Sequence, residues 1–316
     1  MEENKNIELD LSYKSFKEII VSIVLGFFIG LSVIIPGISG TTIAIVMKVY
    51  DKLLYSFANI LKRFKVCFIF LLPIGIGVIL GFGIGLVVVK LLLERFPFPT
   101  ICMFVGLMAG TYPIIHKEIK GAKCNAKRVS LFTAGILIPV AISLIAVFFA
   151  TERELVNLEW WHYLMFMGVG MLISLTQIMP GFSATALLMV MGYYTVLMDS
   201  IGIELIHNLP VLGVFGAMVV GLAIGIVMFS SIIQKNLMHH KHSFFYLICG
   251  LSLGSMISVF TGPDCMDIYK AWTSDTILMS LIPGILTFAA GFTLTFLLYL
   301  YEKKHTKEIN ETPFEE

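Results

Sequence analysis

Two short stretches of this chain combine a Pro-Gly break with the hydroxyl side chains that could bind an anion. They read Pro36-Gly37-Ile38-Ser39-Gly40-Thr41-Thr42 and, 144 residues later, Pro180-Gly181-Phe182-Ser183-Ala184-Thr185. A helix that begins after such a break presents unpaired N–H groups and the positive end of its dipole, and both attract an anion. Glycine lets the backbone approach a ligand closely, and hydroxyl groups add donors. The two stretches therefore predict a site for phosphate or a similar anion.

The predicted anion ligands are backbone and hydroxyl groups of both stretches. They are Gly37, Ser39, Gly40, Thr41, Thr42, Gly181, Ser183, Ala184 and Thr185. Lys48 is a candidate counter-charge and Gln177 a candidate polar lining, although Lys48 is equally well explained as a lysine that extends to the lipid headgroups. The structural alternative is that serine and threonine only cap these helices and the glycines only pack them. The presence of two copies favours binding.

The apolar sequence around both breaks contains almost no ionisable side chain. A Na⁺ or metal site, or a proton relay, would need carboxylates there, so none is expected and no cofactor is predicted. The five cysteines are scattered and form no C-x-x-C, which argues against a zinc site or a disulfide framework. The run His239-His240-Lys241-His242 is interpreted as a solvated loop. A net charge of +1 gives no reason to expect nucleic-acid binding.

The segments that must position these breaks are apolar and long. Of the 316 residues, 58% are hydrophobic and only 14% are charged, well below the quarter typical of soluble domains. A helix needs about 20 apolar residues to cross a bilayer. Segments that meet or approach this length lie near 67–93, 100–115, 130–149, 211–233, 244–260 and 277–301, and the breaks occupy 18–57 and 163–201. The sequence predicts an all-α polytopic membrane protein.

The 144-residue offset relates further landmarks and indicates an internal duplication. Gly77 and Gly81 match Gly221 and Gly225, the run 106–111 matches 250–255, and Ile138-Pro139 matches Ile282-Pro283. The predicted organisation is a cytoplasmic N-terminal segment, two membrane repeats and a cytoplasmic tail. The corresponding ranges are 1–17, 18–158, 159–302 and 303–316.

The charges of the connecting loops predict the orientation of the spans. Loops 58–66, 116–129 and 234–243 carry ten Lys and Arg residues, whereas the alternate loops carry three. Lysine and arginine are enriched on the cytoplasmic side of membrane proteins, so the first set is placed inside and the acidic set outside. Each repeat then crosses the membrane an odd number of times, which makes the two repeats inverted. We favour six full spans plus two re-entrant hairpins at the breaks, with ten spans as the alternative.

The two blocks resemble a known family. The pattern Gly30…Pro36-Gly37-Ile38-Ser39-Gly40-Thr41-Thr42-Ile43-Ala44…Tyr50-Asp51-Lys52-Leu53 resembles the hallmark of the polytopic undecaprenyl-phosphate translocase family, formerly an integral membrane domain of unknown function. Pro180-Gly181-Phe182-Ser183…Gly192-Tyr193-Tyr194 resembles its second hallmark, and the likeness extends from about 18 to 301. Val33, Thr41-Thr42 and Ala184-Thr185 depart from the residues that members usually show.

The resemblance implies a flippase in the bacterial plasma membrane. It would return undecaprenyl phosphate, the lipid carrier of cell-wall synthesis, from the outer to the cytoplasmic leaflet for reuse. Its partners would be this polyprenyl phosphate and membrane lipids, and both termini are expected in the cytoplasm.

Two other functions are open at this point. One is a secondary transporter of a small soluble anion. The other is an integral-membrane polyprenyl-pyrophosphate phosphatase, which would need carboxylates beside a nucleophilic serine and an arginine for the transferred phosphate. The nearest acid upstream of Ser39 is Glu18, and no Lys or Arg lies between Arg153 and Lys235. The sequence therefore disfavours hydrolysis, and no catalytic residue is predicted.

Overall fold

The structure is a computed structural model, and it is all-helical in the part of the chain that it describes. It describes residues 11–37, 43–44, 47, 49–59, 62–148, 155, 158–178, 183–202 and 208–311. Its helices are α1 (Phe16–Ile34), α3 (Tyr50–Asn59), α4 (Phe64–Arg95), α5 (Pro97–Lys117), α6 (Ala126–Phe148), α7 (Trp160–Ile178), α8 (Ala184–Met191), α9 (Tyr194–Ser200), α10 (Leu209–Thr261), α11 (Pro263–Lys270) and α12 (Ser274–Glu311). Within these ranges, seven helical segments are long and apolar enough to cross a membrane. The predicted class, an all-α polytopic membrane protein, is confirmed.

The chain divides into two compact units. The first unit contains Met1–Val89 and Leu300–Glu316, and the second contains Lys90–Tyr299. The predicted repeat boundary near residue 158 is a different division, based on sequence similarity, and it stays a prediction.

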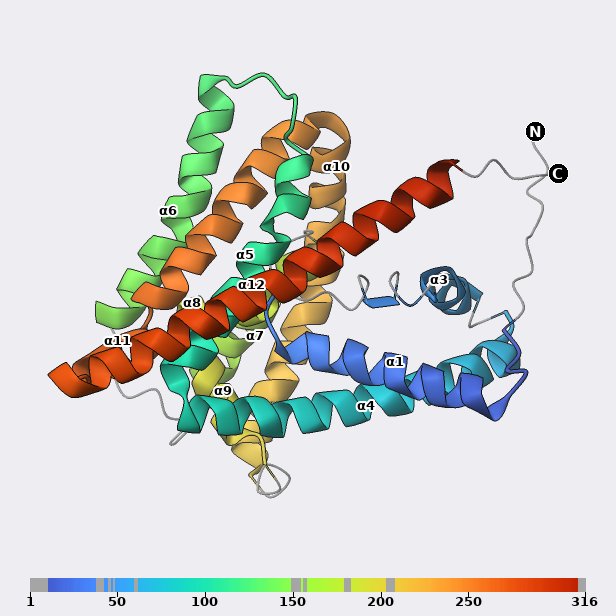
Figure 1. Ribbon diagram of the computed structural model, residues 1–316, viewed down its shortest axis with the longest axis horizontal. Coiled ribbons are helices and arrows are strands. Elements are labelled where there is room, and N and C mark those ends of the chain that lie inside the picture. The colour runs from blue at the N-terminus through green and yellow to red at the C-terminus, as the bar shows by residue number, and fades with distance from the viewer. Residues whose placement is uncertain are drawn as a thin grey trace. The chain divides into compact units, whose positions relative to one another are not determined.

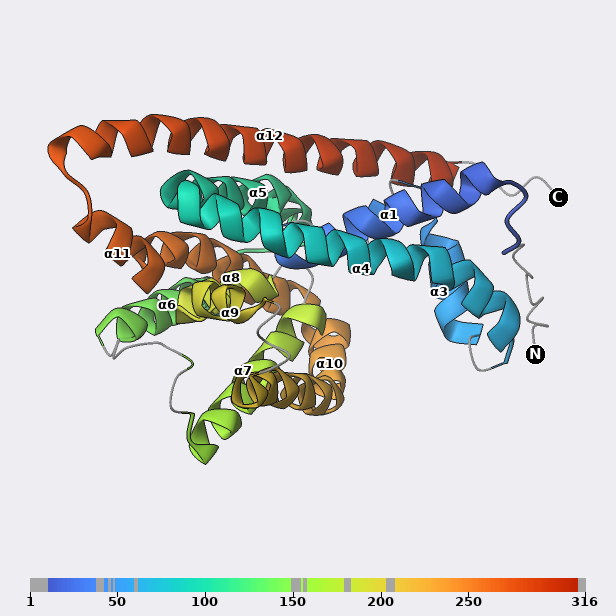
Figure 2. The ribbon, with the colours of Figure 1, turned by 90° about the horizontal axis from the view of Figure 1, so that it is seen from below.

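In the first unit, α1 packs directly on α4, and the two helices lie side by side in both views (Figures 1 and 2). A Cβ added to Gly26 would lie 2.0 Å from the carbonyl oxygen of Ile74, and one added to Gly77 would lie 2.0 Å from that of Ile23. The backbones therefore touch where a side chain would otherwise separate them. In a bilayer, burial of apolar side chains does not drive helices together, because lipid is as apolar as leucine. Helices associate instead through close packing, which small residues such as glycine allow.

The second unit repeats this contact between α7 and the first arm of α10, residues Leu209–Phe229. A Cβ on Gly170 would lie 2.1 Å from the oxygen of Met218, and one on Gly221 would lie 1.9 Å from that of Met167. All four residues lie 144 positions after their counterparts in α1 and α4. The helices agree as well, since α1 and α7 are 19-residue helices whose first residues are also 144 positions apart. The pair α7–α10 thus packs through the same positions as the pair α1–α4, as the internal duplication of the sequence predicts.

Helix α10 consists of two arms joined at a bend, and Figure 1 shows the chain turning back there. His240 has non-helical backbone angles, φ −134° and ψ 36°, within a continuous 53-residue run. The salt bridge from Lys241 Nζ to Glu118 Oε2, 2.7 Å long, joins the start of the second arm to the end of α5. The predicted histidine-rich loop is therefore a tight turn between two spans.

In the second unit, the remaining long helices of one half of the sequence pack on those of the other: α5 on α12, and α6 on the second arm of α10. Gly106 of α5 approaches the backbone of Phe288 in α12, and Gly250 of the second arm of α10 approaches Phe132 in α6. The glycines are 144 residues apart, whereas Phe132 and Phe288 are 156 apart, so the second half holds twelve extra residues. The extra residues fall within 262–281, the counterpart of 118–125, and this stretch contains α11 and the start of α12. The sequence match of Ile138-Pro139 with Ile282-Pro283 is therefore out of register by that insertion.

The lengths of the helices beside the two breaks show which of them could cross a bilayer. The helices that precede them, α1 and α7, have 19 residues each, which is about 28 Å of helix and close to the thickness of the hydrocarbon layer. Behind the second break, α8 has eight residues and α9 has seven, so neither is long enough to span a bilayer alone. The re-entrant form of the two segments stays a prediction.

Labelling of native cysteines should test the predicted orientation. Cys124 is exposed between α5 and α6, whereas Cys67, Cys102, Cys249 and Cys265 are buried. A membrane-impermeant maleimide should therefore label the wild-type protein at Cys124, and only from the cytoplasmic side. In a Cys124→Ser background, Thr273→Cys should be labelled only from outside. Labelling of both positions from the same side would contradict the predicted topology.

Candidate functional site

The first break ends α1 at Pro36 and Gly37, a proline without an N–H and a glycine in a left-handed backbone conformation. The N–H of Ile35 donates to the oxygen of Leu31 at 3.3 Å, and Pro36, which has no N–H to continue the ladder, is buried. Gly37 follows with φ +88°, in the left-handed region that disfavours side chains. Ser39, Gly40, Thr41, Thr42 and Lys48 lie outside the described residues. The described part shows a sharp helix end in the middle of apolar sequence, as predicted.

The second break is described on its downstream side. Ser183 caps α8, because its Oγ accepts from the N–H of Ala186 at 3.4 Å. The hydroxyls of Ser183 and Thr185 lie 2.7 Å apart. Gly181 lies outside the described residues, and Gln177 belongs to α7 with a side chain that is not described. The structure thus brings two of the predicted hydroxyls together at the start of a helix.

This arrangement leaves donors for a ligand even though Ser183 serves as a cap. Only one of the two hydroxyls can donate along their shared contact, so the other O–H is free to donate elsewhere. The N–H groups of the first helical turn have no partner within the helix. Capping and anion binding are therefore compatible at this position.

Helix α8 is held inside the second unit rather than on its surface. Ala186, Met189 and Val190 are almost fully buried, and Thr185 is 8% exposed. A Cβ added to Gly262, at the end of α10, would lie 3.5 Å from the oxygen of Met189. The start of α8 is partly shielded from water, since Thr185 is buried while Ser183 and Ala184 are half-buried, and this shielding strengthens its interaction with charge.

A row of buried serines on the second arm of α10 was not singled out from the sequence. Ser252, Ser255 and Ser258 are spaced three residues apart, so they lie near one face of the helix, and each is at most 3% exposed. Ser258 Oγ donates to the oxygen of Gly254 at 2.6 Å, but Ser255 Oγ is buried without a hydrogen-bond partner. A buried hydroxyl without a hydrogen-bond partner costs free energy. The signal in the sequence was three serines at helical spacing within an apolar segment.

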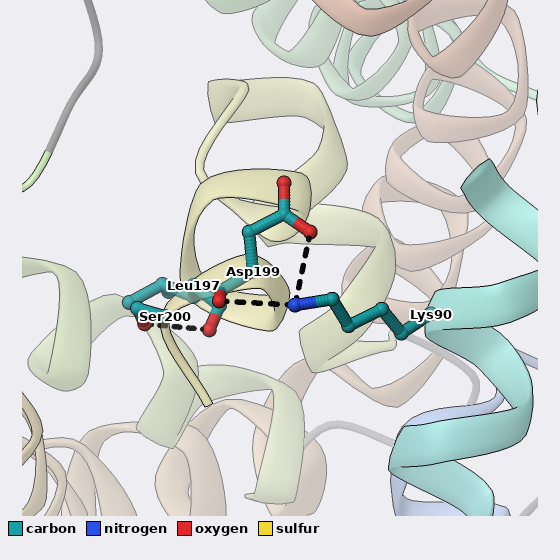
Figure 3. A network of polar contacts seen from close by, with 4 residues as sticks. All are labelled: Lys90, Leu197, Asp199 and Ser200. Carbon is teal, nitrogen blue, oxygen red and sulfur yellow. Dashed lines mark hydrogen bonds and ion pairs between the residues drawn. The ribbon is translucent and has the colours of Figure 1, made fainter. Parts of the chain in front are cut away.

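Lys90 and Asp199 connect α4 to the end of α9, as Figure 3 shows. Lys90 Nζ donates to the backbone oxygen of Asp199 at 3.2 Å and lies 3.8 Å from Oδ1 of the same residue. Ser200 Oγ donates to the oxygen of Leu197 at 2.7 Å in the same turn. The ammonium group thus satisfies the carbonyl end of α9, where the helix dipole is negative. Its role in this structure is to position α9.

The described helices do not bring metal ligands together. Across the ranges described above, no group of three His, Cys, Asp or Glu side chains is placed to hold an ion. The chemistry available at the second break is that of neutral donors in an apolar surrounding. Such a site suits binding of an anionic group.

The fold and the breaks define a polytopic helical membrane protein with a donor-rich helix start inside the protein. A family model described as undecaprenyl phosphate translocase-like matches residues 29–277, which include both breaks. The chain belongs to this family.

Two relatives agree with this assignment. The chain is 33% identical over 245 residues to a polyprenyl-phosphate transporter of Staphylococcus aureus, covering 77% of this chain and 86% of the relative. It is 24% identical over 249 residues to a polyprenyl-phosphate transporter of Vibrio cholerae, covering 74% and 75%. No solved structure matches the chain.

Proposed function

We propose that this protein is a flippase that returns undecaprenyl phosphate from the outer to the cytoplasmic leaflet of the bacterial plasma membrane. The observation that carries the proposal is the family match, which spans both Pro-Gly breaks. Relatives named polyprenyl-phosphate transporters support the substrate class. The seven apolar helical segments support a membrane location.

The phosphate is proposed to bind at the two breaks near the middle of the membrane. At the first break the ligands are Gly37, Ser39, Gly40, Thr41 and Thr42, and at the second they are Gly181, Ser183, Ala184 and Thr185. The repeated sequence supports equivalent roles for the two sets, and the free O–H of the Ser183–Thr185 pair supports donation at the second. Lys48 and Gln177 are proposed as the counter-charge and the polar lining.

Translocation would proceed by alternating access around this site. A charged headgroup cannot cross hydrocarbon alone, because an unpaired charge in a low-dielectric medium is very costly. Donors at the helix starts replace the water that the phosphate loses, while the prenyl tail remains in lipid. The two repeats, inverted in the predicted topology, would open the site to one leaflet at a time.

The proposed chemistry is transport without hydrolysis. A phosphatase would need an acid or base beside the nucleophile and a cation on the phosphoryl group. Around the second break, the sequence from 154 to 234 contains no Lys or Arg. Binding and release of an intact phosphate needs neither group.

A leaflet-exposure assay tests the function. Purified protein in liposomes should make a fluorescent polyprenyl phosphate in the inner leaflet accessible to a membrane-impermeant quencher, while a fluorescent phosphatidylcholine stays protected. Cells that lack the protein should expose more undecaprenyl phosphate at their outer surface. Uptake of radiolabelled inorganic phosphate without lipid exposure would instead indicate a soluble-anion transporter. Release of phosphate from undecaprenyl pyrophosphate would indicate a phosphatase.

A further inference from the structure

The second unit contains a pocket that the two breaks do not explain. It has a volume of about 720 Å³ and lies among the end of α4, the start of α5, α11 and the first half of α12. This volume is in the range of about 300–1,000 Å³ typical of small-molecule sites. Its lining includes Arg95, Phe96, Phe98, Trp272 and Met279.

The walls of the pocket are suited to hydrocarbon. The rings of Phe98 and Trp272 meet edge to face with centroids 5.0 Å apart, which fixes an aromatic wall. Two lining hydroxyls are already paired, since Thr100 Oγ1 donates to the oxygen of Phe96 at 2.7 Å and Thr287 Oγ1 to that of Pro99 at 2.7 Å. These two hydroxyls need no hydrogen bond from a ligand, and the rest of the lining is mostly apolar, with Ser280 as a further hydroxyl.

The rim of the pocket joins the lipid-facing surface. Phe96 is 59% exposed and Met279 is 76% exposed, and both line the pocket. In a membrane protein, large exposed apolar side chains of this kind contact acyl chains. A hydrocarbon chain too long for the pocket can therefore leave over this rim into the bilayer.

One cation in the pocket has no acidic partner. Among the described residues, the ion pairs join Lys90 to Asp199, Lys241 to Glu118 and Lys270 to Asp267, and none of them uses Arg95. Asp267 also lines the pocket, but its carboxylate lies 3.0 Å from Lys270 Nζ and is compensated there. The guanidinium of Arg95 is the group that matches a phosphate, with a planar fork of donors that binds two oxygens at once.

The pocket also breaks the internal symmetry of the fold. One wall is α11, which lies in the stretch 262–281 that is twelve residues longer than its counterpart in the first half. The equivalent connection from α5 to α6, residues 118–125, contains no helix. In the predicted topology α11 and the turn after α4 lie on the outer face, so the insertion adds a pocket on that side of the protein.

We infer that this pocket is the outer-leaflet loading site for a polyprenyl phosphate. Arg95 binds the phosphate, the first isoprene units lie against Phe98 and Trp272, and the rest of the tail leaves over Met279 into the membrane. The inference rests on the proposed function, because it names where the transported lipid is first captured. A loading site on the outer face gives the transporter a preferred leaflet for uptake.

Photo-crosslinking with a diazirine analogue of farnesyl phosphate tests this inference on the purified full-length protein. We expect labelled peptides within residues 267–283, and competition by unlabelled farnesyl phosphate and undecaprenyl phosphate. Arg95→Gln should weaken binding about tenfold, since a charge-assisted contact to phosphate is lost. Arg95→Lys should retain part of it. Lys127→Gln, which removes an exposed cation at the start of α6, should bind as the wild type does.

Each contrary result has a distinct meaning. Equal competition by farnesol would overturn the phosphate role of Arg95, and equal competition by phosphatidic acid would overturn the preference for polyprenyl lipids. Competition by inorganic phosphate alone, or labelling confined to other helices, would overturn the site. Ser183→Ala should keep the label and lose translocation. Labelling in a wild-type protein that translocates no lipid would overturn the proposed transport while supporting the binding site.

Discussion

Replacing Gly77 by alanine should destabilise the protein, whereas replacing Gly75, two residues away in the same helix, should not. A Cβ at Gly77 would lie 2.0 Å from the oxygen of Ile23 and 2.8 Å from the nitrogen of Phe27, both backbone atoms of α1. Backbone cannot rotate away as a side chain can, so α1 and α4 must separate. Overpacking of this kind costs about 1–3 kcal/mol. A Cβ at Gly75 meets no atom within 4 Å.

The measurement is thermal unfolding of the purified protein in detergent. Gly77→Ala should lower the unfolding temperature, and Gly75→Ala should leave it unchanged or raise it slightly, because alanine favours helix over glycine by up to about 1 kcal/mol. The repeat supplies a second matched pair, since a Cβ added to Gly221 would lie 1.9 Å from the oxygen of Met167 and one added to Gly216 would meet no atom within 4 Å. Equal unfolding temperatures for Gly77→Ala and Gly75→Ala would show that α1 and α4 do not pack as described.

Replacing Ser183 by alanine should reduce binding of polyprenyl phosphate at the second break about ten- to hundredfold. The hydroxyl pair with Thr185, 2.7 Å apart, loses one oxygen, and with it a donor to a charged group in a dry site, which is worth about 1–3 kcal/mol. The cap of α8 is lost as well, at a cost of about 0.5–2 kcal/mol in stability. The cap bond to Ala186 is 3.4 Å long, so the loss of stability should be near the lower end.

Ser183→Gly separates the two roles. Glycine is nearly as good an N-cap as serine but has no hydroxyl, so this variant should melt close to the wild type while binding and translocating poorly. Ser183→Thr keeps the hydroxyl and should retain both. Binding of a fluorescent polyprenyl phosphate, measured beside thermal unfolding in an Arg95→Gln background that weakens the pocket site, distinguishes the outcomes. If Ser183→Gly bound the lipid as the wild type does, Ser183 would act only as a helix cap and would not belong to the proposed phosphate site.

The sequence by itself determined the membrane class, the positions of six of the seven apolar helical segments and the helix end at Pro36. These properties depend on local composition: long apolar runs must be helical in lipid, and proline has no N–H to continue a helix. Matching glycines 144 residues apart in the sequence, such as Gly77 and Gly221, indicated that the two halves share contacts. In the structure these glycines form the contacts of α1 with α4 and of α7 with α10. The hydroxyls at the second break were also predicted, because Ser183 and Thr185 are neighbours in the chain.

Only the tertiary structure decided which of the long helices pair and what lies between them. Helices α5, α6, α12 and the second arm of α10 are all apolar, so their composition does not specify partners. The contacts of Gly106 with Phe288 and of Gly250 with Phe132 revealed the twelve-residue insertion. In the sequence this insertion was hidden, because Ile138-Pro139 matched Ile282-Pro283 at the wrong offset. The burial of Ser255 and the pocket around Arg95 follow from the same long-range packing. The sequence alone did not specify them, because each depends on contacts between segments far apart in the chain.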